Sequence, residues 1–149
     1  MKIIQGIPKS YRSPVIVWSY KYFNHLVSKK EFTEIINNGT NWDLSLMLVE
    51  DDDEEEVLGL YLLGNEQISS VLNTHEYTGM TGIEGILLVI DDSIRGQGWG
   101  TKLKDYTMTM GFDYVWGQQY KSLNNLDEWL KRRTLIGQSE HINITAEFF

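Results

Sequence analysis

Apolar residues follow one another without interruption from Ile86 to Ile90, in the last part of a stretch that begins at Ile83. A strand that is covered on both faces has this continuous pattern, whereas a half-exposed strand alternates apolar and polar positions. The pattern therefore predicts a central strand over residues 83–90. Glu84 is the conspicuous exception, because it places a carboxylate near the start of this strand.

A helical pattern follows this strand. Apolar residues recur at intervals of three and four positions over residues 101–110, which places them on one face of a helix, and Gly111 closes it. Residues 112–116 then predict another strand. Two strands joined through a crossover helix are parallel neighbours, so we expect strands 83–90 and 112–116 to run in parallel.

The rest of the chain mixes strand and helix patterns. Ser28 and Glu31 have the spacing of a capping box, which predicts a helix that ends near Gly39. The other predicted elements are a strand at 15–18, a helix from residue 19, strands at 42–49 and 57–63, a polar connection at 65–82, a helix at 122–133 and last strands at 135–136 and 141–149; residues 3–7 form a short edge strand or a packed arm.

Length and composition indicate one folded unit. A chain of 149 residues with 42% apolar residues can bury a sizeable core, so we expect a single mixed α/β domain over residues 1–149. Phe148 and Phe149, at the end, either close the core or meet a second subunit in a homodimer.

The net charge of −8 is concentrated in one place. Residues 50–56 are seven consecutive acids, and without them 14 acidic residues stand against 13 basic ones, a net charge of −1. A run of like charges usually stays hydrated, so we interpret it as a solvated turn between strands 42–49 and 57–63. No basic stripe is available for phosphates, which argues against a nucleic-acid partner.

The cysteine and histidine content of the chain argues against several other classes of protein. It has no cysteine, which rules out disulfides and thiolate metal sites. The three histidines have no metal-binding spacing, so we expect no metal site. No apolar run is long enough to cross a bilayer and no signal segment is present, so we expect a soluble cytoplasmic protein without a membrane partner.

The candidate chemistry begins with the glycine-rich stretch Arg95-Gly96-Gln97-Gly98-Trp99-Gly100, between the central strand and the helix from Thr101. Glycines let the backbone approach a ligand closely, and the first amides of a helix lack partners within it. Such a loop suits a phosphate or pyrophosphate. It lacks the Gly-Lys-Ser/Thr end of a Walker loop, and its glycine spacing differs from that of the dinucleotide fingerprint.

Read as Arg95-x-x-Gly98-x-Gly100, the stretch resembles the acyl-CoA loop of the GNAT N-acetyltransferase superfamily. This resemblance implies a GNAT fold, with a central, mixed and mostly antiparallel sheet of six to seven strands, helices on both faces and a parallel strand pair that splays apart. It implies acetyl-CoA as co-substrate. The resemblance assigns the pyrophosphate to the amides of Arg95, Gly96, Gln97, Gly98, Trp99, Gly100 and Thr101, and the pantetheine arm to the main chains of Leu88, Val89 and Ile90.

Two further roles come from the same resemblance. In members similar to the histone-modifying enzymes, a glutamate six residues before the end of the central strand is the general base, and Glu84 stands six residues before Ile90. A partly desolvated carboxylate with a raised pKa can take a proton from an ammonium acceptor. The alternative is a strand-end carboxylate that faces water.

The helix at 122–133 matches the family only in part. Asn125 can fill the place of the asparagine near the coenzyme. The family's tyrosine, which protonates the leaving thiolate, is missing, since Arg132 occupies its place. Tyr120 is the nearest phenol and the candidate acid, with a packed surface residue and protonation by solvent as alternatives.

We therefore expect an N-acetyltransferase that acts on a primary amine of a small molecule or peptide. Two alternatives stay open, namely a catalytically inactive module with this fold that binds acyl-CoA and an enzyme that binds a nucleotide at the same loop. The identity of the amine is beyond the sequence, because one fold serves many acceptors.

Overall fold

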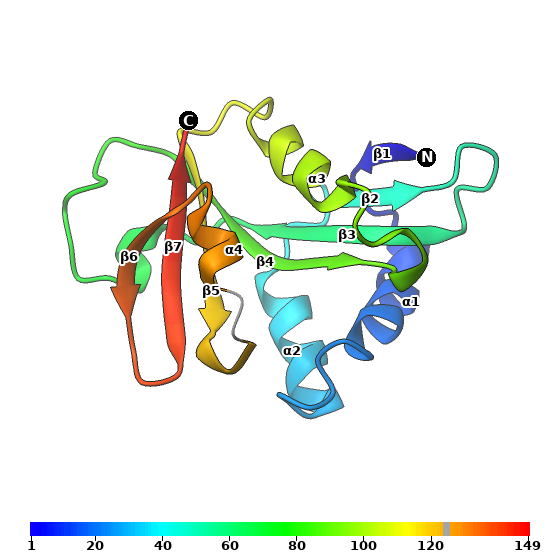
Figure 1. Ribbon diagram of the computed structural model, residues 1–149, viewed down its shortest axis with the longest axis horizontal. Helices are drawn as coiled ribbons and strands as arrows, with labels where there is room; N and C mark the ends of the chain where they lie inside the picture. Colours follow the sequence, from blue (N-terminus) through cyan, green and yellow to red (C-terminus); the bar gives the residue numbers. More distant parts are fainter. Residues whose placement is uncertain (124–125) are drawn as a thin grey trace. The chain divides into compact units, whose positions relative to one another are not determined.

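The computed structural model describes residues 1–123 and 126–149 (Figure 1). The helices and strands in chain order are β1 (Lys2–Gln5), α1 (Lys9–Tyr20), α2 (Lys29–Gly39), β2 (Leu46–Val49), β3 (Val57–Gly64), β4 (Gly82–Ile90), α3 (Trp99–Thr107), β5 (Tyr114–Tyr120), α4 (Leu126–Leu130), β6 (Thr134–Gln138) and β7 (Ile142–Phe148). Short 3₁₀ turns lie at Ile68–Ser70, Asp92–Ile94 and Lys121–Leu123.

In the described residues, seven strands form one sheet in the order β1-β2-β3-β4-β5-β7-β6. β4 and β5 run parallel. The pairs β1 with β2, β2 with β3, β5 with β7 and β6 with β7 run antiparallel. The prediction of a mixed and mostly antiparallel sheet with one parallel pair is confirmed.

Contacts divide the chain into two compact units. Unit 1 consists of residues 1–64 and 86–106, and unit 2 of residues 65–85 and 107–149. β4 therefore contributes its first residues to unit 2 and its last residues to unit 1. The expectation of a single domain over residues 1–149 stays a prediction.

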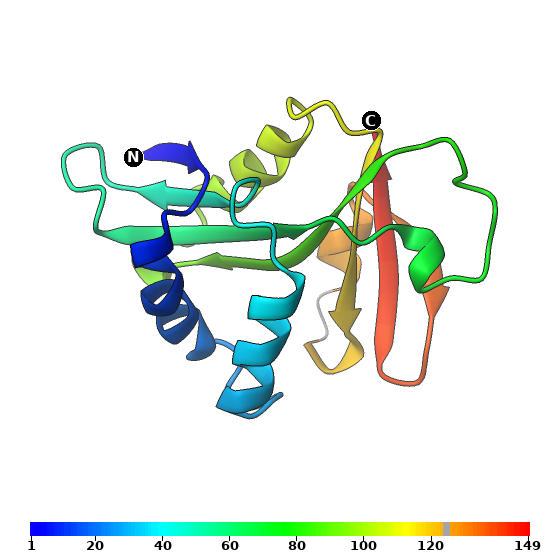
Figure 2. The ribbon, with the colours of Figure 1, turned by 180° about the vertical axis from the view of Figure 1, so that it is seen from behind.

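In unit 1, helices cover both faces of the strands. α1 and α2 lie on one side of β2 and β3, and α3 lies on the other side, in both views (Figures 1 and 2). Successive side chains of a strand point to opposite faces. Accordingly, Met47 and Val49 belong to the cluster with α1 and α2, whereas Leu48 packs in a cluster with Trp99 of α3.

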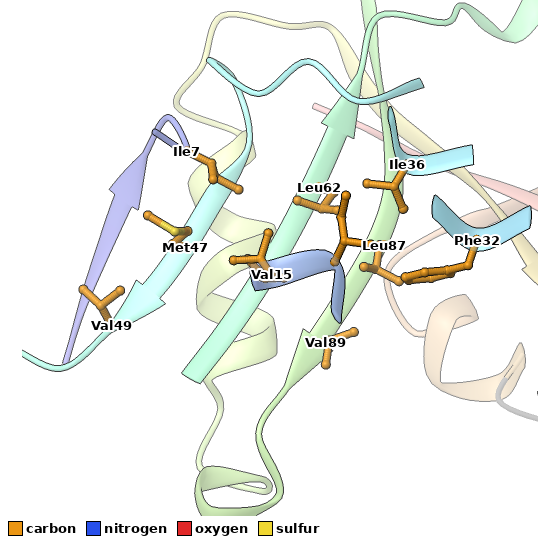
Figure 3. Close-up of a cluster of buried hydrophobic side chains, with 11 residues drawn as sticks. Ile7, Val15, Phe32, Ile36, Met47, Val49, Leu62, Leu87 and Val89 are labelled. Atoms are coloured by element: carbon orange, nitrogen blue, oxygen red, sulfur yellow. The ribbon is translucent and has the colours of Figure 1, made fainter. Parts of the chain in front are cut away.

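The main core of unit 1 lies between the strands and the helix pair α1–α2 (Figure 3). Burial of apolar surface stabilises such a cluster by roughly 25 cal/mol per Å² removed from water. The side chains labelled in Figure 3 point toward one another from both layers, and they are Ile7, Val15, Phe32, Ile36, Met47, Val49, Leu62, Leu87 and Val89.

The prediction of a strand at residues 15–18 is wrong, because this segment lies inside α1. Val15, Ile16 and Ser19 are buried, whereas Val17 is 58% exposed. This is the burial pattern of one helical face. β-Branched residues favour strands, but the place beside β2 is taken by β1, where Ile3 pairs with Leu48. The short edge strand expected within residues 3–7 is thereby confirmed.

The helix start predicted from Ser28 and Glu31 is confirmed, with Ser28 as the N-cap of α2. The Ser28 hydroxyl accepts a hydrogen bond of 3.2 Å from the amide of Glu31. Phe32 and Ile36 are the buried residues of this helix. The helix predicted from residue 19 is wrong over most of its length, because α1 ends at Tyr20 and turns follow it.

The acidic run connects β2 and β3, as predicted. It is exposed except at its first residue, and it forms exposed ion pairs with the N-terminal amino group through Asp51 (2.8 Å) and with Lys2 through Glu54 (2.7 Å). The amide of Asp91 donates to the carbonyl oxygen of Leu58 (2.8 Å). The acids therefore lie at the end of the unit 1 strands where β4 finishes.

Unit 2 is built around a three-stranded antiparallel arrangement. β5 pairs with β7 from Tyr114, opposite Phe148, to Tyr120, opposite Ile142. β7 pairs with β6 on its other side. α4 lies in front of β5 in Figure 1 and behind it in Figure 2, and it contacts β7. The buried cluster of this unit consists of Ile68, Tyr114, Trp116, Ile144 and Ala146.

Several predicted bounds in this part of the chain need correction. In the described part of the helix expected over residues 122–133, residues 122 and 123 belong to a 3₁₀ turn and α4 ends at Leu130. Leu130, the last residue of α4, is 38% exposed. Phe148 and Phe149 are also exposed, although Phe148 stacks on Tyr77 with ring centroids 5.5 Å apart. The homodimer stays a prediction.

Candidate functional site

The glycine loop of unit 1 has the backbone expected of an anion-binding turn. Gly96 and Gly98 have φ values of 82° and 85°, which side chains rarely adopt, so only glycine takes this path without strain. α3 begins inside the motif at Trp99, two residues earlier than predicted. The amide of Lys102 donates to the carbonyl of Gly98 (3.1 Å). The amides of Trp99, Gly100 and Thr101 precede this bond, at the positive end of the helix dipole.

Asp91 shapes the entry to the loop. Its carboxylate accepts hydrogen bonds from the amide (3.0 Å) and the hydroxyl (2.8 Å) of Ser93. These bonds hold the pKa of Asp91 below its usual value, and the nearby positive charge of Lys21 adds to the effect. The carboxylate therefore stays ionised and caps the 3₁₀ turn at Asp92–Ile94 that leads into Arg95.

Arg95 ties the loop to the end of β4. Its guanidinium donates to the carbonyl oxygen of Ile90 (2.9 Å), pairs with Asp92 (3.0 Å) and lies over the ring of Tyr22, 5.5 Å from its centroid. Its amide makes a long hydrogen bond to the Asp92 carbonyl (3.4 Å). The side chain of Arg95 thus ties the loop to β4 and Tyr22, although Arg95 is exposed, as are Gly96, Gln97 and Gly98.

The last residues of β4 contribute mainly through their backbone. The side chain of Val89 is buried in the main core of unit 1, and Ile90 packs in the cluster with Trp99. Gly100 lies in the first turn of α3, where a Cβ added to it would be 3.7 Å from the Ile90 side chain, an ordinary van der Waals distance. The predicted contact of Leu88, Val89 and Ile90 with a pantetheine arm through their main chains stays a prediction.

Glu84 is the candidate base, and it belongs to unit 2. It is half-buried and lies in register with Trp116 on the parallel neighbour β5. Burial raises the pKa of Glu84 to about 7, and the negative charge of Glu66 contributes to the rise. In the part of the chain that the structure describes, the Glu84 carboxylate has no hydrogen-bond partner. A carboxyl group with these properties gains and loses its proton near neutral pH.

The segment at Glu66 and Gln67 is the part of the site that sequence reasoning missed. The indole N–H of Trp116 donates to the carbonyl oxygen of Glu66 (2.8 Å). The side chain of Gln67 exchanges hydrogen bonds with the backbone of Gly82, two residues before Glu84. Both residues lie in an irregular polar connection, where no periodicity marks a buried or functional position.

Two other predicted residues stand apart from Glu84. Tyr120 is the last residue of β5, four residues beyond Trp116, which corresponds to about 13 Å along a strand. Its role as an acid stays a prediction. Asn125 lies outside the described residues.

Within the described residues, no group of three or more His, Asp or Glu side chains is arranged to hold a metal ion. No helix in this part of the chain combines the length and the apolar character needed to cross a bilayer.

The fold is similar to solved structures of acetyltransferases. An acetyltransferase of the GNAT family from Staphylococcus aureus Mu50 has 10% sequence identity and a TM-score of 0.68, with 99% of this chain and 98% of that chain covered. NAA60 from Arabidopsis thaliana in complex with acetyl-CoA has 17% identity and a TM-score of 0.64, with 99% and 100% covered. PaiA N-acetyltransferase from Thermoplasma acidophilum in complex with coenzyme A has 12% identity and a TM-score of 0.60, with 100% of both chains covered.

No protein-family model matches the sequence, and no curated protein sequence matches it. At identities of 10 to 17%, the similarity concerns the fold.

Proposed function

We propose that this chain, which has the fold of the GNAT acetyltransferases, is an N-acetyltransferase that moves an acetyl group from acetyl-CoA to a primary amine of a small molecule or peptide. The observation that carries the proposal is the state of Glu84, a half-buried carboxyl group with a pKa of about 7 on the strand that leads into the glycine loop. A general base works best when its pKa lies near the operating pH.

The loop fits the pyrophosphate of acetyl-CoA. The loop is exposed, two of its glycines have a left-handed backbone conformation, and the first amides of α3 follow it directly. In this proposal the amides of Gly96 to Thr101 bind the phosphate oxygens, and Arg95 holds the loop in place. Two of the similar solved structures contain coenzyme A or acetyl-CoA, which supports this assignment.

Glu84 prepares the acceptor for direct attack. Its carboxylate takes a proton from the ammonium group of the acceptor, directly or through water, and the neutral nitrogen gains a lone pair. Acetyl-CoA supplies an acyl carbon activated as a thioester. The new nitrogen–carbon bond forms at this carbon as the carbon–sulfur bond breaks, and the sulfur leaves as a thiolate. The acylated nitrogen releases its second proton to water, which leaves a neutral amide.

The remaining roles are assigned to the backbone and to Tyr120. Backbone amides of β4, at Leu88, Val89 and Ile90, orient the bound arm and polarise the thioester carbonyl. The thiolate takes a proton from Tyr120 or from water. Asn125 is proposed as a further contact to the coenzyme.

The first test is thermal unfolding with and without acetyl-CoA, coenzyme A, ATP and NAD. A ligand present at 100 times its dissociation constant stabilises the native state by about 2.7 kcal/mol. We expect both coenzyme A forms to raise the melting temperature and the two nucleotides to leave it unchanged. A shift with ATP or NAD instead would favour the nucleotide-binding alternative.

The second test separates an enzyme from an inactive binding module. Wild type, Glu84→Gln and the control Glu140→Gln, an exposed residue, are compared in an acetyl-transfer assay with a panel of amines. We expect Glu84→Gln to lose about 10²- to 10⁴-fold in kcat and to keep its affinity for acetyl-CoA. Binding of acetyl-CoA without transfer to any amine by the wild type would favour the inactive module.

A further inference from the structure

The side chain of Gln67 acts as a strand partner for Gly82. Its Nε2 donates to the Gly82 carbonyl oxygen (2.9 Å), and its Oε1 accepts from the Gly82 amide (2.9 Å). In a sheet, these two backbone groups are normally satisfied by a residue of the neighbouring strand. At this position, a carboxamide side chain supplies both hydrogen bonds.

The contact is reinforced from two sides. Gln67 Nε2 also donates to the carbonyl oxygen of Asn65 (2.9 Å), and the hydroxyl of Tyr114 donates to Gln67 Oε1 (3.3 Å). The ring of Tyr114 covers Gly82 so closely that an added Cβ would overlap it. The carboxamide is therefore held in one orientation between the segment that follows β3 and the start of β4.

This arrangement bears directly on Glu84. Side chains two residues apart on a strand point to the same face, so Glu84 lies on the face of Gly82. Tyr114 and Trp116, the register partners of Gly82 and Glu84, pack with Ile68 in the buried cluster of unit 2. The segment that begins with Glu66 thus covers the face of β4 on which Glu84 lies.

Few ionisable groups surround this face. In the described residues, Glu66 is the charged group that acts on Glu84. Asp113 accepts a hydrogen bond from the amide of Thr81 (2.8 Å), at the residue before β4. The phenols of Tyr77 and Tyr114 have pKa values raised by burial, so they stay neutral near pH 7.

We propose that Gln67 is a positioning residue for Glu84, which fixes the first residues of β4 so that the Glu84 carboxylate stays half-buried beside Glu66. This inference rests on the proposed function, because it assumes that Glu84 is the base. Without the two hydrogen bonds, the buried amide and carbonyl of Gly82 lose their partners. The strand end then loosens, and water reaches Glu84.

The test compares wild type, Gln67→Met and the control Gln138→Met, on β6. Methionine is similar in length to glutamine but cannot form the two hydrogen bonds. The carboxyl of Glu84 is titrated by carbon NMR, with Glu84→Gln identifying the signal. We expect a midpoint near 7 in the wild type and in Gln138→Met, and a lower midpoint in Gln67→Met. An unchanged midpoint in Gln67→Met would overturn the inference.

The kinetic readout is a split between kcat and KM. We expect Gln67→Met to lose at least about tenfold in kcat at pH 7, since small misplacements of a catalytic group are costly, with an unchanged KM for acetyl-CoA. Tyr114→Phe removes the weaker 3.3 Å bond to Gln67 and the hydroxyl's bond with the Ile68 backbone, but it keeps both bonds between Gln67 and Gly82, so it should shift the titration in the same direction by less. This milder variant keeps the test available if Gln67→Met unfolds.

The titration also separates this inference from the proposed function. It measures Glu84 directly and needs no acetyl transfer. A lowered midpoint in Gln67→Met together with an inactive wild type would support the positioning contact and contradict the enzyme. An active wild type together with an unchanged Glu84 midpoint in Gln67→Met would support the enzyme and contradict the positioning contact.

Discussion

Trp116 holds Glu66 against the strand that carries Glu84: its indole N–H donates to the Glu66 carbonyl oxygen across 2.8 Å, and Trp116 itself is fully buried. The main chain of Glu66 is thereby fixed, while its carboxylate stays exposed. Because Trp116 lies in register with Glu84, the main chain of Glu66 lies over the face of β4 that carries Glu84. Repulsion between the two glutamates helps to keep Glu84 protonated below neutral pH.

The first prediction concerns the pH dependence of transfer. Glu84 must be ionised to act as a base, so kcat/KM should rise with pH through a midpoint near 7. Glu66→Gln removes the repelling charge and keeps the main-chain bond to Trp116. We expect its midpoint to lie below that of the wild type but above 4.5, because burial is the larger cause. The pH profile of Glu140→Gln should match that of the wild type.

The second prediction concerns stability. The pKa of Glu84 is about 7 in the folded state and 4.5 as an unperturbed group, so the folded state binds more protons between these values. The stabilisation from Glu84 is fully present below pH 4.5 and is lost as pH rises to about 7.

Glu84→Gln, which cannot ionise, should therefore gain stability relative to the wild type over this window. We expect about 1 to 2 kcal/mol after allowance for solvent screening of a half-buried group, measured by urea unfolding at pH 4.5 and pH 8. An equal difference at both pH values would contradict the raised pKa.

The third prediction uses two matched glycines. Gly98 and Gly111 have φ values of 85° and 87°, and an added Cβ meets nothing within 4 Å at either position. Alanine at each should destabilise the fold by about 1 kcal/mol because of its backbone conformation. Only Gly98→Ala should also lower the affinity for acetyl-CoA, by about tenfold, because it distorts the amides of the loop. Titration calorimetry of both variants checks this, and equal affinities would argue against the loop as the binding site.

The fourth prediction concerns the start of β4. A Cβ at Gly82 would overlap the Tyr114 ring, so Gly82→Ala should cost about 1 to 3 kcal/mol of folding stability. In Gly39→Ala the added Cβ makes an ordinary contact of 3.5 Å with Ile86, and its stability should stay within about 0.5 kcal/mol of the wild type. Chemical unfolding of the two variants provides the comparison, and equal stability would show that Tyr114 adapts.

Local signals were reliable where they described interactions between near neighbours in sequence. The helix start at Ser28, the acidic turn before Val57 and the continuous apolar strand ending at Ile90 all appear in the structure. Each depends on the hydrogen bonds or burial of its own segment. The strand expected at residues 15–18 failed because its β-branched residues favour a strand locally, whereas packing in the main core favours a helical face.

By itself, the sequence determined the position of the glycine loop between a buried strand and a helix, and the presence of a carboxylate near the start of that strand. Adjacent residues and the conformational freedom of glycine are enough for these inferences. Only the tertiary structure decided that Glu66 and Gln67 stand beside Glu84. Their hydrogen bonds to Trp116 and Gly82 join residues 50 and 15 positions apart, and the half-burial that raises the pKa of Glu84 exists only once these segments have packed together.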